Sequence, residues 1–224
     1  MQIRRPAPDE LVAKVFPLRW YAFEPSPPEP GRVAESERFV RYTAADHTLV
    51  AEEGDQVLAV ATGISMRQNL RGTVHPMAGV AGVASHPLAR RRGHVRALLN
   101  RLLGEMRDSG HPLSALYPFR PSFYQRFGYV GLPAERTASF APADLRPFLD
   151  ADLDGELHWE RIGTGHEAFR TFTGQLLARR HGFAVHPAHR ATLPGDLDQS
   201  WLVTARVAGA VVAATRYRIA EHGG

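Results

Sequence analysis

The chain has 224 residues, of which 44% are hydrophobic and 22% charged, and this composition excludes an intrinsically disordered chain, a collagen and a long coiled coil. Its formal net charge of +4, if spread evenly, is too small to indicate nucleic-acid binding. The absence of cysteine excludes disulfides, thiolate metal ligands and cysteine nucleophiles.

The first part of the chain is expected to contain helices with one break. Helical stretches fit the segment from Asp9 to about Thr43, and 36–43 fits a short helix of its own. The run from Pro25 to Gly31 cannot continue a regular helix, because proline lacks an N–H group and fixes φ. Apolar and β-branched residues then predict three strands, over 47–52, 56–65 and 77–85, the first two joined by a turn at Gly54.

The strongest predicted element is a helix that follows Gly93. Its apolar residues recur with helical spacing and form one stripe, and the helix is expected to stop at Ser109-Gly110. The stripe consists of Val95, Leu98, Leu99, Leu102, Leu103 and Met106.

The remaining elements suggest an α/β (α+β) chain with two parts. The first part continues with a short strand over 113–117, a short helix over 121–127, a strand from 130 to 140 and a connector over 142–149. The second part has a strand over 157–162, a helix over 166–181 and strands over 201–207 and 210–219. We therefore expect domains at 1–145 and 156–224, the second of which looks incomplete.

The segment between the third strand and the long helix has the character of a phosphate site. The free N–H groups and the dipole of the helix point back at this turn, and Gly93 lets an anion approach the backbone closely. Arg90, Arg91 and Arg92 add charge and paired donors. The pattern is neither GxGxxG nor GxxxxGK[ST], so it predicts a phosphate or diphosphate cradle of another kind, the alternative being a solvated basic face.

This segment, VASHPLARRRGHVRALL, resembles the acetyl-CoA-binding segment of the GCN5-related N-acetyltransferase (GNAT) superfamily. Its R-x-x-G-x-(G/A) signature reads Arg90 to Val95 here, with Val95 in place of the usual small residue. The later stretch SALYPFRPSFYQRFGYV is similar to the ending typical of that fold. Together the two motifs resemble the Eis-like (enhanced intracellular survival) branch. The resemblance is strong over Val80–Gly131, and elsewhere it extends only to the order of elements.

The resemblance implies a GNAT fold, with a mixed, mainly antiparallel central sheet flanked by helices, followed by a partial second GNAT-like unit. It also implies acetyl-CoA as cosubstrate, with no metal. Residues of the third strand would pair with the pantetheine arm, the arginine loop would hold the diphosphate, and two further residues would lie near the coenzyme. By position these are Val83, Ala84 and Ser85; Arg90, Arg91, Arg92, Gly93, His94, Val95 and Arg96; and Phe119 and Arg120.

Tyr124 matches the family tyrosine that protonates the leaving thiolate. That role suits the chemistry, because transfer of acetyl from a thioester to an amine needs a neutral amine, a donor to the carbonyl oxygen and a proton for sulfur. The alternative is that Tyr124 only packs against Phe123 and Phe127. In the Eis-like branch the general base is a C-terminal carboxylate, which Gly224 does not match, so the base stays unassigned and the chain looks truncated.

An acceptor pocket is expected near the N-terminus. Trp20, Tyr21, Phe23 and Glu24 combine aromatic rings with a carboxylate, which suits a cationic amine, although an amphipathic helix would give the same pattern.

The closest histidines, at 181, 186 and 189, lack metal-ligand spacing, so no metal site is expected. No apolar run approaches the ~18 residues of a membrane helix and no signal peptide is recognisable, so a cytoplasmic protein without a membrane partner is expected.

The sequence thus favours an N-acetyltransferase that acts on a small-molecule or peptide amine, such as an aminoglycoside, a polyamine or a lysine. Two alternatives stay open. The first is a GNAT-fold protein that binds coenzyme A without turnover, and the second is a nucleic-acid-binding module built on the arginine patch. The second is disfavoured because an aromatic stacking platform is missing. The resemblance also implies a homo-oligomer, which is a hexamer in that branch.

Overall fold

The computed structural model describes residues 1–25, 27–29, 31–132, 137–148 and 151–219. The chain divides into two compact units. Unit 1 joins Met1–Tyr117 to Thr173–Asp196, and unit 2 joins Pro118–Phe172 to the described part of Leu197–Gly224. The predicted domain limits of 1–145 and 156–224 stay a prediction, since a compact unit is not by itself a domain.

Unit 1 is built on a mixed sheet in the order β1-β2-β3-β4-β5. Only β4 and β5 run parallel, so the sheet is mainly antiparallel, as predicted. A further short strand, β7, pairs with the far end of β3. The strands are β1 (Gln2–Arg4), β2 (His47–Glu53), β3 (Gln56–Leu70), β4 (Thr73–Ser85), β5 (Leu113–Ala115) and β7 (Ala184–Val185).

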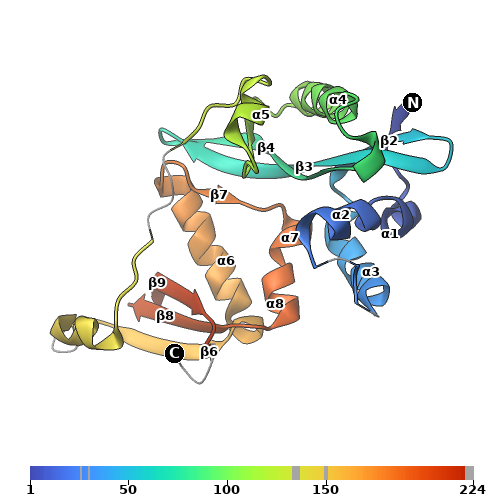
Figure 1. Ribbon diagram of the computed structural model, residues 1–224. Helices are drawn as coiled ribbons and strands as arrows, with labels where there is room; N and C mark the ends of the chain where they lie inside the picture. The colour runs from blue at the N-terminus through green and yellow to red at the C-terminus, as the bar shows by residue number, and fades with distance from the viewer. Residues whose placement is uncertain (26, 30, 133–136, 149–150, 220–224) are drawn as a thin grey trace. The chain divides into compact units, whose positions relative to one another are not determined.

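Helices cover both faces of this sheet (Figure 1). On one face lies α4 (His94–Asp108), and on the other lie α1 (Leu11–Lys14) and α2 (Phe16–Phe23). The chain continues from α2 to α3 (Arg32–Thr43), which confirms the predicted short helix and extends it towards the N-terminus. Alternation along the strands explains the two-sided core, because successive side chains point to opposite faces.

The predicted apolar stripe is the core of the α4 face. Leu98, Leu99 and Leu102 are fully buried, and Met106 is nearly so. A Cβ on Gly63 of β3 would lie 3.0 Å from the Met106 sulfur, so the absence of a side chain there lets α4 approach the sheet. On the opposite face, residues of α1 and α2 pack on Val50, Val60 and Ala84, which are register partners on β2, β3 and β4.

Unit 2 contains a three-stranded antiparallel sheet in the order β6-β8-β9. Trp159 of β6 stacks on Trp201 of β8 with ring centroids 4.3 Å apart. The helix α6 (Ile162–Arg179) divides between the two units. The other elements after β5 are α5 (Pro121–Gln125), β6 (Glu156–Arg161), α7 (Ala188–Ala191), α8 (Leu193–Leu197), β8 (Trp201–Val207) and β9 (Ala210–Tyr217); 3₁₀ turns span Pro8–Glu10, Pro87–Ala89 and Pro142–Phe148.

The strand predicted from 130 to 140 is wrong. Residues 130–132 and 137–140 belong to no strand, and 133–136 lie outside the described residues. The side chains of Val130, Leu132 and Phe140 are largely exposed, and without a neighbouring strand an apolar segment has no ladder to join. The other predicted strands and helices form, with changed limits. β3 reaches Leu70, β4 begins at Thr73 and α6 begins at Ile162, so these are longer than predicted. β5 and α5 are shorter and end at Ala115 and Gln125.

The α4 face of the core yields a stability prediction. Leu102→Ala should lower the free energy of unfolding by about 2–5 kcal/mol, because it leaves a cavity where the side chain is now fully enclosed. Leu88→Ala is the matched control, since Leu88 is 78% exposed and should change stability by less than about 0.5 kcal/mol. Urea unfolding followed by circular dichroism compares the two. A similar loss for both variants would contradict this packing.

Candidate functional site

The most informative irregularity of unit 1 is a β-bulge in β4. The register to β3 pairs Thr62 with Ala81 and Val60 with Ala84, so one extra residue lies between these pairs on β4. Gly82, at the bulge, has a positive φ of 59°, a conformation that glycine adopts without strain. A bulge bends the strand and increases its twist. The bulge therefore turns the last residues of β4 away from the straight course of the sheet.

Beyond the bulge, β4 has one edge without a strand partner. Along this edge β5 pairs only with Met77, Ala78 and Gly79, and then ends. Among the described residues, no strand is paired with this edge over Val83–Ser85, which are three of the residues predicted to bind the coenzyme. Unpaired backbone groups on a strand edge are available to an extended ligand that carries amide groups.

The loop after β4 is both cationic and conformationally unusual. Arg90, Arg91 and Arg92 are all exposed. Arg91 has a φ of 62°, which is uncommon for a residue with a Cβ, and Gly93 follows with a φ of 84°. Arg90 lies over the ring of Tyr21, with its guanidinium carbon 5.7 Å from the centroid. These conformations turn the chain sharply from β4 into α4.

The start of α4 is free of the groups that usually neutralise a helix N-terminus. Gly93 is the N-cap, so no side chain caps the helix, and no acidic residue occurs in its first turn. His94, Val95 and Arg96 form that turn. Their backbone N–H groups and the helix dipole attract an anion, and Arg96 adds a further exposed cation. Unit 1 thus has a cationic and uncapped helix start at this place, and its use as a phosphate cradle stays a prediction.

Tyr124, Phe119 and Arg120 belong to unit 2, where the tyrosine lies in an aromatic cluster. Tyr124 is 4% exposed, and its ring meets those of Phe119, Phe123 and Tyr129 edge-on at centroid distances of 5.7, 5.0 and 5.9 Å. Burial raises the pKa of the Tyr124 phenol, so it carries its proton at neutral pH. Phe119 is largely exposed and Arg120 precedes α5.

The residues predicted to line an acceptor pocket differ in their surroundings. Trp20 packs in the core between α2 and the sheet. Phe23, the last residue of α2, is exposed, and Glu24 directly after it is half-buried. Tyr21 is exposed on the same helix and contacts Arg90. The role of these residues in acceptor binding stays a prediction.

The structure adds polar residues that the sequence analysis did not select. Arg19 of α2 lies against Gly82. The helix α2 lies on the face of the sheet opposite α4 (Figure 1). Asp46, which directly precedes β2, accepts hydrogen bonds from Arg190 and is paired with His189 at 2.9 Å. A glycine inside a strand pattern was the available signal for the bulge. The pairing of Asp46 with residues some 140 positions later had no signal in the sequence.

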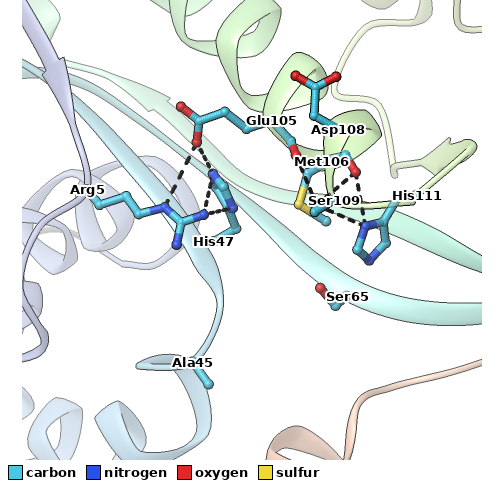
Figure 2. Close-up of a pocket in the computed structure, with 9 residues that line it drawn as sticks. All are labelled: Arg5, Ala45, His47, Ser65, Glu105, Met106, Asp108, Ser109 and His111. Carbon is cyan, nitrogen blue, oxygen red and sulfur yellow. Dashed lines mark hydrogen bonds and ion pairs between the residues drawn. The ribbon is translucent and has the colours of Figure 1, made fainter.

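A hollow of about 520 Å³ lies at the other end of α4 (Figure 2). His47 binds Glu105 there at 2.5 Å, and burial lowers the pKa of His47. The Ser109 hydroxyl shares its one proton between the carbonyls of Glu105 and Met106 and lies 3.4 Å from Nδ1 of His111. Eleven residues of α4 lie between the arginine loop and Glu105, the first α4 residue of the hollow, and they span roughly 18 Å. We therefore interpret it as distinct from the predicted coenzyme site.

Within the described ranges, no group of three histidine, aspartate or glutamate residues is arranged to hold a metal ion. The same part of the chain contains no helix that is both long and apolar enough to cross a membrane.

Residues 3–131 match the family described as "Acetyltransferase (GNAT) domain". The match covers more than half of the chain, and the chain therefore belongs to this acetyltransferase family. An "N-acetyltransferase Eis" of Mycobacterium tuberculosis is 39% identical over 80 residues, which are 35% of this chain and 20% of that protein. An "Uncharacterized N-acetyltransferase" of Streptomyces avermitilis is 33% identical over 96 residues, or 42% of this chain and 24% of that one. The Eis-like resemblance is thereby confirmed.

Solved structures confirm the GNAT fold. A probable N-acyltransferase of Enterococcus faecalis superposes with a TM-score of 0.75 at 20% identity, over 98% of this chain and 55% of that chain. A GCN5-related N-acetyltransferase of Kribbella flavida gives 0.69 at 24% identity, over 92% and 52%. Eis1 of Mycobacterium abscessus gives 0.65 at 18% identity, over 91% and 50%. The chain spans about half the length of these solved chains.

The positive φ of Gly93 leads to a second prediction. Gly93→Ala should destabilise the protein by about 1–2 kcal/mol, because alanine is strained at this φ although an added Cβ would meet only the end of Arg96, at 3.6 Å. Gly104→Ala, inside the same helix and in open space, should instead stabilise by about 0.5–1 kcal/mol. Thermal unfolding distinguishes the two, and a stabilised Gly93→Ala variant would contradict this loop geometry.

Proposed function

We propose that the chain transfers the acetyl group of acetyl-CoA directly to a primary amine. The observation that carries the proposal is that two features follow each other along the chain. After the bulge, β4 has an edge without a described strand partner, and α4 begins nine residues after the end of β4 with a cationic, uncapped N-terminus. A pantetheine arm has amide groups that can pair with a strand edge, and its diphosphate needs backbone donors and cations. The two features supply both needs in the order in which the coenzyme presents them.

On this proposal, Val83, Ala84 and Ser85 hold the pantetheine arm through their backbone. The loop and first helical turn from Arg90 to Arg96 hold the diphosphate, and Phe119 and Arg120 lie near the coenzyme. A backbone N–H at Val83 or Ser85 donates to the thioester oxygen, where negative charge develops during attack. Membership of an acetyltransferase family supports acetyl-CoA as the donor.

The reaction forms one C–N bond and breaks one C–S bond. The neutral amine attacks the thioester carbon, the tetrahedral intermediate expels the thiolate, and the nitrogen loses a proton to solvent or to a base. We assign the proton that the sulfur receives to the Tyr124 phenol. Because its pKa is raised, the buried Tyr124 phenol is still protonated when the thiolate forms. The phenol then donates this proton to the thiolate sulfur.

The acceptor is proposed to be a primary amine of a small molecule or a peptide, with Trp20, Phe23 and Glu24 on the acceptor side. The relatives named Eis support this assignment only in part, because the matched stretch is 20% of their length.

Binding of the diphosphate can be tested by comparing acetyl-CoA with S-acetylpantetheine, which lacks it. Acetyl-CoA at saturating concentration should raise the melting temperature by roughly 4 °C or more, and S-acetylpantetheine should bind about 100-fold more weakly. Arg92→Gln should weaken only acetyl-CoA, whereas Arg107→Gln, at the far end of α4, should change neither. Equal affinity for both ligands would refute the proposed cradle.

The role of Tyr124 is tested by measuring thiol release in the presence of a panel of primary amines. Tyr124→Phe should lower kcat about 100-fold while the Kd of acetyl-CoA stays unchanged, because only the proton donor is lost. Phe123→Leu is the control for the aromatic cluster and should retain most of the rate. Equal rates for wild type and Tyr124→Phe would show that Tyr124 is not the general acid. If acetyl-CoA binds but no amine of the panel causes thiol release, the protein binds the coenzyme without turnover.

A further inference from the structure

Arg19 is a buried cation with an incomplete set of partners. Its guanidinium donates one hydrogen bond, of 2.5 Å, to the hydroxyl of Thr62, which is itself fully buried and also bonded to Thr48. The Nε of Arg19 is enclosed and has no partner, although the residue as a whole keeps some exposed surface. Burial lowers the pKa of Arg19 to about 10, so the group remains charged at neutral pH.

The charge of Arg19 is not balanced by a carboxylate of its own. Asp46 is the acidic group whose field reaches Arg19, but its oxygens are already bound by Arg190 and His189. The field of Arg190 also acts on Arg19, with the opposite effect. Among the described residues, no carboxylate hydrogen-bonds to Arg19. Two arginines and one aspartate thus leave this part of unit 1 with at least one net positive charge.

This charge lies directly behind the β4 bulge. A Cβ on Gly82 would stand 2.8 Å from the Nε of Arg19 and 3.2 Å from its central carbon. Glycine at this position therefore lets the guanidinium rest against the backbone from which the unpartnered edge starts. On the proposed function the thioester lies at this edge, and the pantetheine arm, being neutral, brings no compensating charge to it.

We propose that Arg19 gives the transfer site a positive potential that selects acceptors carrying a carboxylate near the reacting amine, in preference to polycations. This inference rests on the proposed function and defines its acceptor class. A carboxylate at the far end of the acceptor would supply the missing counter-charge, while a second ammonium group there would be repelled. The Glu24 carboxylate, proposed above for the acceptor side, is assigned to the end that carries the reacting amine. The selection works through the electric field and needs no direct contact with the enclosed Nε.

The same field assists the reaction in a second way. A nearby cation disfavours the charged form of an amine, so more of the bound acceptor is neutral and able to attack. Because more of the bound amine is already neutral, the reaction depends less on a general base, which is unassigned in this site.

A purely structural role for Arg19 predicts different behaviour. Arg19 also lies near the ring of Phe16, with its guanidinium carbon 5.8 Å from the centroid, and could act only as a support for the bulge. In that case its replacement would destabilise the protein and affect all acceptors alike. A charge that serves selection should instead be replaceable by a similar apolar side chain without loss of stability, since its burial is unfavourable.

Three amines of equal chain length test the inference: 4-aminobutanoate, 4-aminobutanamide and 1,4-diaminobutane, whose far ends are negative, neutral and positive. Wild-type kcat/KM should fall in that order, with about a tenfold difference between the first and the last. Arg19→Met should remove the order without lowering the melting temperature, and Arg19→Lys should keep it. Arg107→Met, which removes an exposed charge from the end of α4, is the control for net charge and should leave the order unchanged.

Several outcomes would overturn the inference: 1,4-diaminobutane as the preferred acceptor, no turnover of 4-aminobutanoate, or an unchanged order in Arg19→Met. In each case acetyl-CoA binding, measured by calorimetry on the same samples, separates the two proposals. Binding with turnover of another amine leaves the transferase function intact and rejects only the acceptor class. Absence of both binding and thiol release rejects the proposed function itself.

Discussion

One extra residue in β4 governs the arrangement of unit 1. Before the bulge at Gly82, β4 pairs with β3 on one side and β5 on the other, and after it only the β3 side continues. A bulged strand twists away from its straight neighbour, and β5 accordingly ends at Ala115, opposite Gly79. Among the described residues, the backbone groups on that edge of β4 thereby lack a strand partner, and the proposed function assigns this place to the coenzyme. The bulge also provides the place without a side chain against which Arg19 rests.

The helix start beyond β4 completes this arrangement electrostatically. Arg91 and Gly93 both adopt positive φ, and these two residues bring the free N–H groups of α4 to the end of the strand edge. The α4 core fixes the helix firmly, because Leu98, Leu99 and Leu102 are fully enclosed against the sheet. A rigid helix with a cationic and uncapped N-terminus is a suitable partner for a diphosphate. Two separate sources of positive charge result, one at the loop and one behind the bulge.

Local patterns predicted the parts of this site that depend on local physics. The helix stripe, the arginine loop and the hairpin could be read because period, glycine and charge act over a few residues. The position of Arg19 could not, since it depends on α2 crossing a bulge more than sixty residues away. The Asp46–Arg190 pair depends on a return of the chain to unit 1 after α6. The expected strand from 130 to 140 failed for a related reason, because apolar residues predict a strand only where a neighbour is available to pair with it.

The account depends on acetyl-CoA occupying the edge of β4 and the start of α4 together. Amide hydrogen exchange of the full chain, measured residue by residue with and without acetyl-CoA, tests this most directly. We expect slower exchange at Val83–Ser85 and at Gly93–Arg96, where backbone N–H groups would gain acceptors. Binding that protects the hollow around His47 and Glu105 instead, and leaves both of those segments unchanged, would contradict the account.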